Sequence, residues 1–403
     1  MMRCAVRRSC GVLVKRTTEH AAPLEEWMKE AIGLARRSLG FASPNPAVGC
    51  VLVRDGSVVG RGFHGYDWLE HAEVSALKNA GKLARGSTAY VTLEPCCTTG
   101  RTGPCTKALT DAGVSRVVVA TVDPNPDVNG KGIEQLRAAG VDVVTGMMEA
   151  EARQINDGFA RHIRTGFPFV TLKSAVSLDG RIAPAPGTAP PGAPVYLTGE
   201  KTRAEVHRMR HGVDAVITGI NTVLQDDPLF TDRSELPRRR PLLRVVLDSA
   251  LRIPLDAKLV RTAKEDVVIF CSVAPTEHQR ALEAMGLRIE RVDPETAGPS
   301  APARRVGDPI RRAGVSLTQV LKRLGELDVL SVMLESGAQL NGSALTGKHV
   351  DKLTLFYAPV FLGPGAVPLM QETITGPVLA SQPIIEVIGN DVRIDAYLRD
   401  PWV

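Results

Sequence analysis

The first part of the chain combines one segment with helical spacing of its hydrophobic residues and two segments with strand-like spacing. Leu24–Leu39 has the apolar spacing of a helix and ends at Gly40, a residue that readily adopts the left-handed cap conformation. Two β-rich runs follow, Ala47–Val53 and Ser57–Phe63, and Arg54-Asp55-Gly56 separates them. Because an Asp-Gly pair between two such runs is typical of a tight turn, the pattern predicts a helix followed by a β-hairpin.

After the hairpin, short helical and strand-like segments alternate. Helical spacing occurs at His71–Asn79, Lys107–Ala112 and Ile133–Ala139, and strand-like runs occur at Ala89–Leu93, Arg116–Thr121 and Val141–Val144. Such alternation predicts a parallel sheet covered by helices. Glu149–Arg164 predicts a single closing helix, which Gly166-Phe167-Pro168 ends. We place a domain boundary at this break.

The second half predicts another α/β domain. Its strand-like runs are Val170–Ser174, Ala215–Thr218, Arg244–Leu247, Val267–Cys271, Ser331–Leu334 and Leu353–Tyr357, and its helical runs include Lys201–His211 and Val315–Leu324. The Pro-rich stretches Pro184–Pro194 and Pro294–Arg305 predict surface excursions. With 403 residues, the chain is long enough for two domains. We expect a flexible extension over residues 1–21, a first domain over 22–165 and a second over 166–403.

Composition narrows the class of protein. The 49 basic and 44 acidic residues give a net charge of +5, and the basic residues are spread along the chain, which argues against a nucleic-acid partner. No apolar run approaches the ~20 residues of a membrane helix. Seven cysteines without disulfide-framework spacing favour reduced thiols or metal ligands, and hence the cytoplasm. The basic first twenty residues favour a frayed tail over an organellar targeting signal, which stays an alternative.

His71-Ala72-Glu73, Cys96 and Cys105 form the strongest chemical pattern in the sequence. Two thiolates and one imidazole fill three tetrahedral positions around zinc and leave the fourth to a water molecule, whose pKa the metal lowers toward ~7. Glu73, two residues after the histidine, can carry a proton from that water to a leaving amine. The pattern is typical of zinc-dependent deaminases.

Spacing alone does not fix the ligands, because eight residues separate Cys96 from Cys105 and two other cysteines, Cys97 and Cys50, are available. An ordinary buried position is the alternative for these two thiols. A closed structural zinc site is a further alternative, but it gives Glu73 no role.

Nine segments of the chain, in this order, resemble the bifunctional deaminase/reductase family of riboflavin biosynthesis. They are Ser43–Gly49, His64, His71–Glu73, Glu94–Cys105, Asp123–Pro126, Gly166–Pro168, Lys173–Arg181, Thr222–Pro228 and Glu335–Gly337. The resemblance spans about residues 24 to 395. It implies an α/β protein in which a cytidine-deaminase-like three-layer domain precedes a dihydrofolate-reductase-like α/β domain. It also implies a homo-oligomer that associates through the reductase domain.

The resemblance assigns chemistry to each domain. The first would hydrolyse the ring amino group of 2,5-diamino-6-(5-phospho-ribosylamino)pyrimidin-4-one, with Glu73 catalytic, one zinc ion on His71, Cys96 and Cys105 rather than Cys97, and substrate contacts from Asn45, His64 and Arg101. The second would reduce the ribosyl unit to ribityl with NADPH. Its implied catalytic residues are Lys173, Asp226 and Glu335, its cofactor contacts are Ala175, Tyr196, Thr222, Asp226, Ser249 and Gly337, and its substrate contacts are Lys173, Arg210, Arg233 and Glu335.

The second domain lacks the G-x-G-x-x-G pattern of a standard dinucleotide site. Instead, Ser336–Gly342 follows a predicted strand and precedes a short predicted helix, where free backbone N–H groups can bind phosphate. Three positions depart from the family pattern: Cys97-Thr98 stands where Ser-His is common, Tyr196 where tryptophan is common, and Pro194 where a hydroxyl is usual. A zinc deaminase acting on free nucleosides, bases or tRNA, and a family member with one inactive domain, are the competing hypotheses.

Overall fold

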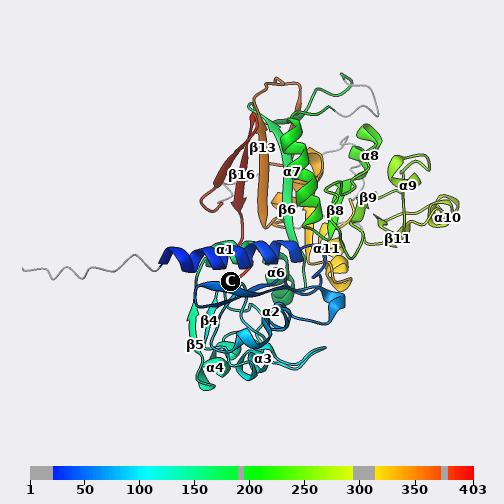
Figure 1. Ribbon diagram of the computed structural model, residues 1–403. Helices are drawn as coiled ribbons and strands as arrows, with labels where there is room; N and C mark the ends of the chain where they lie inside the picture. Colours follow the sequence, from blue (N-terminus) through cyan, green and yellow to red (C-terminus); the bar gives the residue numbers. More distant parts are fainter. Residues whose placement is uncertain (1–20, 189–194, 294–313, 374–379) are drawn as a thin grey trace, which may run out of the picture.

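The computed structural model describes residues 21–188, 195–293, 314–373 and 380–403, and these form two lobes (Figure 1). The predicted extension up to residue 20, Pro194 and the stretch Pro294–Arg305 lie outside the described residues. Within the described ranges, no helix is long and apolar enough to cross a membrane.

The first lobe is built on a five-stranded sheet in the order β2-β1-β3-β4-β5. β1 pairs antiparallel with β2 and β3, whereas β3, β4 and β5 are parallel, so the predicted hairpin and parallel sheet are confirmed. Asp55 and Gly56 both have positive φ, as a tight hairpin turn requires. The elements are α1 (Ala21–Ser38), β1 (Gly49–Arg54), β2 (Ser57–Phe63), α2 (Ala72–Ala80), β3 (Thr88–Val91), α3 (Cys105–Asp111), β4 (Arg116–Val119), α4 (Lys131–Ala138), β5 (Asp142–Thr145), α5 (Glu149–Ile155) and α6 (Asp157–Thr165).

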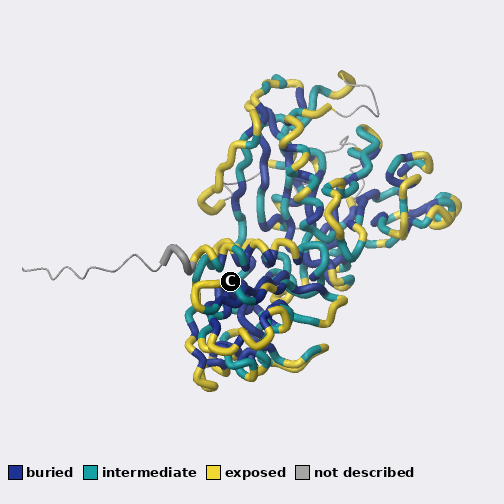
Figure 2. Tube along the Cα trace, in the orientation of Figure 1, coloured by how far each residue is buried: buried dark blue, intermediate teal, exposed yellow. Residues whose placement is uncertain are grey.

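Alternation along the strands builds three layers. Cys50 and Leu52 of β1 belong to a core cluster with residues of α2, α3 and α4, whereas Val51 and Val53 belong to one with residues of α1 and α5. Successive side chains of a strand point to opposite faces, so both faces of this sheet are covered by helices. Figure 2 shows the resulting buried strands in the centre of the lobe.

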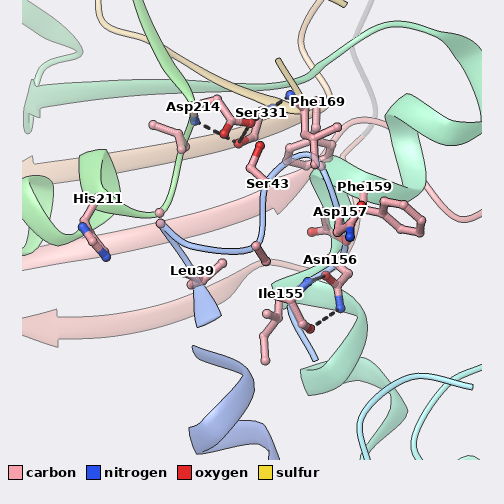
Figure 3. A pocket seen from close by; sticks show the side chains of 18 of the residues that line it. Leu39, Ser43, Ile155, Asn156, Asp157, Phe159, Phe169, His211, Asp214 and Ser331 are labelled. Carbon is pink, nitrogen blue, oxygen red and sulfur yellow. Dashed lines mark hydrogen bonds between the residues drawn. The ribbon is translucent and has the colours of Figure 1, made fainter. Parts of the chain in front are cut away.

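The prediction of a single closing helix over Glu149–Arg164 is wrong. The helix breaks at Asn156, whose φ of −113° and ψ of 18° are not helical. The buried Asn156 side chain pairs with the backbone of Ala47: its Oδ1 accepts from the Ala47 N–H at 2.7 Å, and its Nδ2 donates to the Ala47 carbonyl at 2.9 Å (Figure 3). An asparagine that bonds backbone groups in this way competes with helix continuation.

The second lobe contains a nine-stranded sheet in the order β11-β10-β9-β8-β12-β6-β13-β16-β15. All the predicted strands and helices of this half are present, and β6 extends further than expected, to Ser177. The elements are β6 (Phe169–Ser177), β7 (Arg181–Ala183), α7 (Glu200–His211), β8 (Ala215–Gly219), α8 (Ile220–Asp226), β9 (Leu243–Leu247), α9 (Lys258–Arg261), β10 (Val267–Cys271), α10 (Thr276–Ala284), β11 (Arg288–Arg291), α11 (Leu317–Glu326), β12 (Ser331–Leu334), α12 (Ala338–Thr346), β13 (Lys352–Ala358), β14 (Val367–Pro368), β15 (Ile384–Ile388) and β16 (Asp391–Tyr397).

The strands from β11 to β13 are parallel to their neighbours, and the antiparallel β16 and β15 complete one edge. One face of the sheet packs on leucines of α11, and the other packs on α8, α9 and α10. The parallel part places the carboxyl ends of β6, β8, β9 and β12 at one edge of the sheet. That edge is where open α/β sheets usually bind ligands.

The end of the chain returns to the first lobe (Figure 1). The Asp157 carboxylate, at the start of α6, accepts hydrogen bonds from the Tyr397 hydroxyl at 2.5 Å and from the Trp402 ring N–H at 3.0 Å. The Arg164 guanidinium donates to the Pro401 carbonyl at 3.2 Å. These contacts fasten the last residues of the second lobe to the first.

A cavity of about 180 Å³ lies between the lobes. Ser43 of the first lobe lines it together with Phe169, His211, Asp214 and Ser331 of the second. Figure 3 shows the Ser43 side chain pointing toward Ser331 and Asp214.

Candidate active sites

His71, Cys96 and Cys105 converge in the first domain. Their ligand atoms all lie within 4.8 Å of one another, and among the described residues they form the one His/Cys/Asp/Glu group of this kind. The His71 Nδ1 lies 3.1 Å from the Cys105 Sγ and 3.4 Å from the Cys96 Sγ. One imidazole nitrogen and two sulfur atoms at this spacing fit a tetrahedral zinc ion with one position left open.

Two of the three donors stand at the start of a helix, and Cys96 lies in the loop between β3 and α3. His71 immediately precedes α2, and Cys105 begins α3. Gly62 of β2 permits α2 to approach the sheet, because a Cβ there would lie 2.1 Å from the Ala72 carbonyl oxygen. This close packing sets the depth of His71 and Glu73 in the domain.

Glu94 fixes the loop that carries Cys96. Its buried carboxylate accepts backbone hydrogen bonds from Asp123, Gly130, Gly132 and Ile133 at 2.8 to 3.2 Å. Because these donors come from the loop before α4 and from its first turn, the chain on either side of Glu94 is held against α4. This arrangement gives a physical reason for the Glu94 of the sequence pattern, and Asp123 takes part in it through its backbone N–H.

Glu73 is almost fully buried beside the donor group. Burial raises the pKa of the Glu73 carboxyl to about 7, and the negative charge of Cys96 acts in the same direction. A hydrogen bond with Cys105 lowers the pKa of the Cys96 thiol to about 4, and the contact with His71 adds to the effect. A thiolate ligand and a carboxyl that can exchange a proton near neutral pH therefore stand side by side.

The structure places the two competing cysteines away from the donor group. Cys50 lies in the hydrophobic core between the sheet and α2, where burial raises its thiol pKa well above the usual value. Cys97 is half-buried, and burial raises its pKa as well. Neither thiol belongs to the group of ligand atoms that lie within 4.8 Å of one another.

Asn45 and His64 form a pair beside the donor group. The Asn45 Nδ2 lies 3.1 Å from the His64 Nε2, and the His64 Nδ1 lies 2.8 Å from the Glu70 carbonyl oxygen. Burial lowers the pKa of His64, which fits a neutral ring that donates through Nδ1 and accepts through Nε2. The His64 ring meets the His71 ring edge-on at 5.3 Å. Two further positions that the sequence analysis singled out, Arg101 and Thr98, are exposed to solvent.

In the second domain, Lys173, Arg210 and Glu335 form one ion-pair network. The Arg210 guanidinium makes two hydrogen bonds to the Glu335 carboxylate, at 2.7 and 3.1 Å, and the Lys173 Nζ donates to it at 3.2 Å. Lys173 lies on β6 and Glu335 directly follows β12, the neighbouring strand. All three side chains are at most 15% exposed. Against the effect of burial, the charges of Arg210 and Lys173 lower the pKa of Glu335 to about 2.

Glycines follow or precede the elements at the carboxyl ends of the neighbouring strands. Gly219 follows β8, and Gly337 stands directly before α12. A Cβ on Gly337 would meet only the Thr222 hydroxyl within 4 Å, at 3.9 Å, so the space above its backbone is open. The sequence placed the helix after Gly342, but α12 already begins at Ala338. Ser336, Gly337 and the first turn of α12 therefore offer the backbone N–H groups that could hold a phosphate such as the diphosphate of NADPH.

The other predicted contacts surround this edge of the sheet. Ala175 lies near the end of β6, Ser249 follows β9, and Thr222 and Asp226 lie one turn apart on α8. Burial raises the pKa of the Asp226 carboxyl. Tyr196 is 65% exposed, with the Arg203 guanidinium 4.9 Å from its ring centre. Arg233 is exposed and donates to the Thr231 hydroxyl rather than joining the Glu335 network.

Sequence reasoning did not single out Tyr66 or Arg239. The Arg101 and Arg239 guanidinium groups lie 4.2 and 4.1 Å from the centre of the Tyr66 ring. Arg239 belongs to the Arg238-Arg239-Arg240 run, a charge signal in the sequence, but no spacing rule connects that run to a residue about 170 positions earlier.

Two family models match the chain, each over one of its domains. The model for the cytidine and deoxycytidylate deaminase zinc-binding region matches residues 22–121, and the model for the RibD C-terminal domain matches residues 168–393. The order of the two domains agrees with the predicted order.

Curated proteins and solved structures agree with the family models. The riboflavin biosynthesis protein RibD of Escherichia coli K12 is 39% identical over 353 residues, which cover 85% of this chain and 89% of that protein. The RibD of Aquifex aeolicus is 37% identical over 343 residues, with coverage of 85% and 88%. A solved RibD structure from Acinetobacter baumannii has 35% identity and a TM-score of 0.76, and covers 93% of this chain and 99% of that one. The resemblance inferred from the sequence and the predicted fold class are confirmed.

The choice of Cys105 over Cys97 can be tested by metal content. We expect about one zinc per chain in the purified protein, and a loss of most of it in Cys105→Ala, because removing one of three protein ligands weakens the site strongly. Cys97→Ala is the matched control and should keep its zinc. The measurement is zinc per chain by atomic emission after dialysis. Equal loss in both variants would show that Cys97 also supports the site.

The Glu335 network predicts a pH-dependent contribution to stability. Because the folded pKa of Glu335 is about 2, below its usual 4.5, the carboxylate stabilises the fold above about pH 4.5, and this contribution is lost as the pH falls toward 2. Glu335→Gln should lower the free energy of unfolding at pH 7 by roughly 3 kcal/mol, since it leaves two cations without their partner. The difference should shrink between about pH 5 and pH 3.

Urea unfolding midpoints of both proteins across this pH range provide the measurement. Asp111→Asn is the control, because its ion pair with Lys107 is exposed and contributes little. A wild-type advantage that stays constant down to pH 3 would contradict the assigned pKa.

Proposed function

The chain belongs to the RibD family of riboflavin biosynthesis proteins, and we propose that it catalyses two successive steps on one phosphorylated pyrimidine. The first step is the hydrolytic deamination of 2,5-diamino-6-(5-phospho-ribosylamino)pyrimidin-4-one. The second is the reduction of the ribosyl side chain of the product to ribityl with NADPH. A solved relative from Thermotoga maritima, 31% identical with a TM-score of 0.74, carries both activities in its name.

One observation carries the proposal. His71, Cys96 and Cys105 bring their ligand atoms within 4.8 Å of one another, beside the buried carboxyl of Glu73. A structural zinc site has no use for a buried acid that is not a ligand, whereas a hydrolytic site needs one to move protons.

In the deaminase site, His71, Cys96 and Cys105 hold zinc, which when bound activates water for attack on the ring carbon. Glu73 takes a proton at its carboxylate and gives it to the departing amino group, as its pKa of about 7 permits. Asn45 and His64 orient the pyrimidine. In their pairing the Asn45 side chain keeps its carbonyl oxygen free to accept a hydrogen bond from the substrate.

In the reductase site, bound NADPH supplies the hydride. Lys173 holds its Nζ proton beside the sugar and can donate it as the ribosyl ring opens, while Glu335 keeps both Lys173 and Arg210 in place. Arg210 and the exposed Arg233 offer cationic partners for the substrate phosphate. Ala175, Tyr196, Thr222, Asp226, Ser249 and Gly337 contact the cofactor.

We place the boundary between the deaminase and reductase domains at residues 165 and 166, where α6 ends at Thr165 and Gly166 has a φ of 73°. We also propose that the protein works in the cytoplasm. Its thiol-rich zinc site requires a reducing compartment, and its named relatives are bacterial proteins.

The competing hypotheses explain less of the molecule. A deaminase that acts only on nucleosides, bases or tRNA leaves the Lys173–Glu335–Arg210 network without a role. An inactive deaminase domain would rest on Thr98 alone, because Glu73 and the three zinc donors are all in place.

The two activities can be separated in one assay. Zinc-loaded protein is incubated with the diaminopyrimidine ribosyl phosphate, with and without NADPH, while ammonia release and NADPH absorbance are followed together. We expect ammonia in both conditions and NADPH oxidation only after deamination. Glu73→Gln should slow ammonia release by about 10²- to 10⁴-fold and leave reduction of the deaminated pyrimidine intact. Lys173→Ala should slow reduction of the deaminated pyrimidine and leave ammonia release intact.

The contradicting result is also specific. Reduction of the deaminated pyrimidine without any ammonia release by the wild-type protein would show that the deaminase domain is inactive, and would point to the Cys97-Thr98 departure.

We further propose that the chain forms a homo-oligomer through the reductase domain. β15 is an edge strand of the nine-stranded sheet, and its Ile384, Ile385 and Val387 side chains are 51 to 71% exposed. An exposed apolar edge strand is a common place for a second chain to pair. Light scattering should report at least two chains, and Val387→Lys should shift the protein toward one. A wild-type mass of a single chain would contradict the proposal.

A further inference from the structure

Tyr66, close to the deaminase site, is contacted by arginines from both domains. The Arg101 Cζ lies 4.2 Å from the ring centre, and the Arg239 Cζ lies 4.1 Å from it. Arg101 belongs to the loop between Cys96 and Cys105. Arg239 lies within the stretch that matches the RibD C-terminal domain. A residue of the reductase domain therefore reaches the deaminase domain at the loop that contains a substrate contact.

Both arginines are anchored beside groups of the deaminase site. Arg101 precedes Thr102, whose hydroxyl lies 3.4 Å from the His71 Nε2. The Arg239 Nη1 donates to the Ser43 carbonyl at 3.1 Å, two residues before Asn45, and its backbone N–H donates to the Gly40 carbonyl at 2.7 Å. The two guanidinium groups thus flank the loops that carry a zinc ligand and a pyrimidine contact.

The charge at this place is unbalanced toward the positive. The two Cζ atoms lie no farther apart than the sum of their distances to the ring centre, about 8 Å, which is comparable to the screening length in physiological salt. Among the described residues, one acidic side chain forms an ion pair with these two arginines: Asp67, whose carboxylate lies 2.9 Å from the Arg239 Nε. The Asp67 side chain is 62% exposed, so water weakens its attraction.

Both guanidinium groups also have N–H donors that their hydrogen bonds within the described part of the protein do not use. Each guanidinium has five N–H donors. The side-chain hydrogen bonds given for Arg101 use one nitrogen, Nη1, which donates to the Tyr66 carbonyl, and those of Arg239 use Nε and Nη1. The cation–π contacts with the Tyr66 ring hold both guanidinium groups near it, and a guanidinium is suited to bidentate hydrogen bonds with a phosphate. Both Cζ atoms lie within 4.2 Å of one ring centre, and each such bond spans about 2.8 Å, so a phosphate at the edge of the Tyr66 ring can accept hydrogen bonds from both groups.

We propose that Arg239 and Arg101 together bind the phosphate of the deaminase substrate, so that the reductase domain supplies a binding residue to the deaminase site. This inference rests on the proposed function and adds to it the residue that selects a phosphorylated substrate. Arg239 gives the deaminase its preference for the ribosyl phosphate over the free riboside.

The test compares the phosphorylated substrate with its dephosphorylated riboside. Arg239→Ala should raise the KM for the phosphorylated substrate by about tenfold or more and leave the KM for the riboside nearly unchanged, because the lost hydrogen bonds involve the phosphate alone. Arg239→Lys should recover part of the loss, since it restores the charge without the bidentate geometry. Arg240→Ala is the matched control. It removes a neighbouring charge, whose Nη1 donates to the Asp328 carbonyl, and should change neither KM.

Binding of inorganic phosphate to the zinc-loaded proteins, measured by ³¹P NMR, gives a second readout that does not require turnover. We expect weaker binding in Arg239→Ala than in the wild type and in Arg240→Ala. NADPH oxidation with the deaminated substrate checks that the variant is folded.

Two results would overturn the proposal. Equal loss of activity toward the phosphorylated substrate and the riboside would show that Arg239 only positions the Ser43–Asn45 loop. Unchanged KM values together with unchanged phosphate binding would show that it has no role in binding. A wild-type protein that releases no ammonia refutes the proposed deaminase function instead, and in that case the phosphate titration still decides whether Arg239 binds the anion.

Discussion

The pairing of Asn156 with the backbone of Ala47 fixes the last helices of the first domain, from which the chain continues into the second. It ends α5 and begins α6, and it ties the last helices of the first domain to the loop that leads from Asn45 into β1. The next residue, Asp157, receives hydrogen bonds from Tyr397 and Trp402 near the end of the chain. Two adjacent side chains therefore connect the deaminase loop, the domain boundary and the C-terminus. Buried polar pairs of this kind fix orientation, because a partial shift leaves a donor or acceptor without a partner.

Three buried glutamates show how one residue type takes three roles. Glu94 accepts four backbone N–H groups and holds the zinc-ligand loop. Glu335 is surrounded by Arg210 and Lys173, which lower its pKa to about 2 and keep it charged. Glu73 lies beside a thiolate, and its pKa rises to about 7. Glu73 can therefore exchange a proton near neutral pH, whereas Glu335 stays ionised, so their surroundings alone separate the behaviour of these two carboxyl groups.

Local patterns predicted the parts of the fold that depend on local physics. The alternation of helical and strand-like segments after the hairpin predicted a sheet covered by helices, and His71, Glu73, Cys96 and Cys105 were recognisable because each residue type has a distinct chemical use. The break at Asn156 escaped prediction, since helical spacing continues through it and the partner that stops the helix is Ala47, far away in sequence. The exposed β15 lacks the buried alternation that marks a strand. The contact of Tyr66 with Arg239 depends on how two domains meet, which no spacing rule describes.

The same geometry bears on how the intermediate moves between the two sites. The cavity between the domains, about 180 Å³, is smaller than the ~300 Å³ at which clefts begin to hold ligands of this size. This cavity is therefore too small to hold the intermediate together with its ribosyl phosphate. Under the proposed function, Arg101 and Arg239 at the deaminase site and Arg210 and Arg233 at the reductase site offer cations to the same substrate phosphate. Positive groups at both sites raise the local concentration of a phosphorylated molecule relative to a neutral one. The phosphate would thus be the one group of the substrate that both sites recognise by its charge.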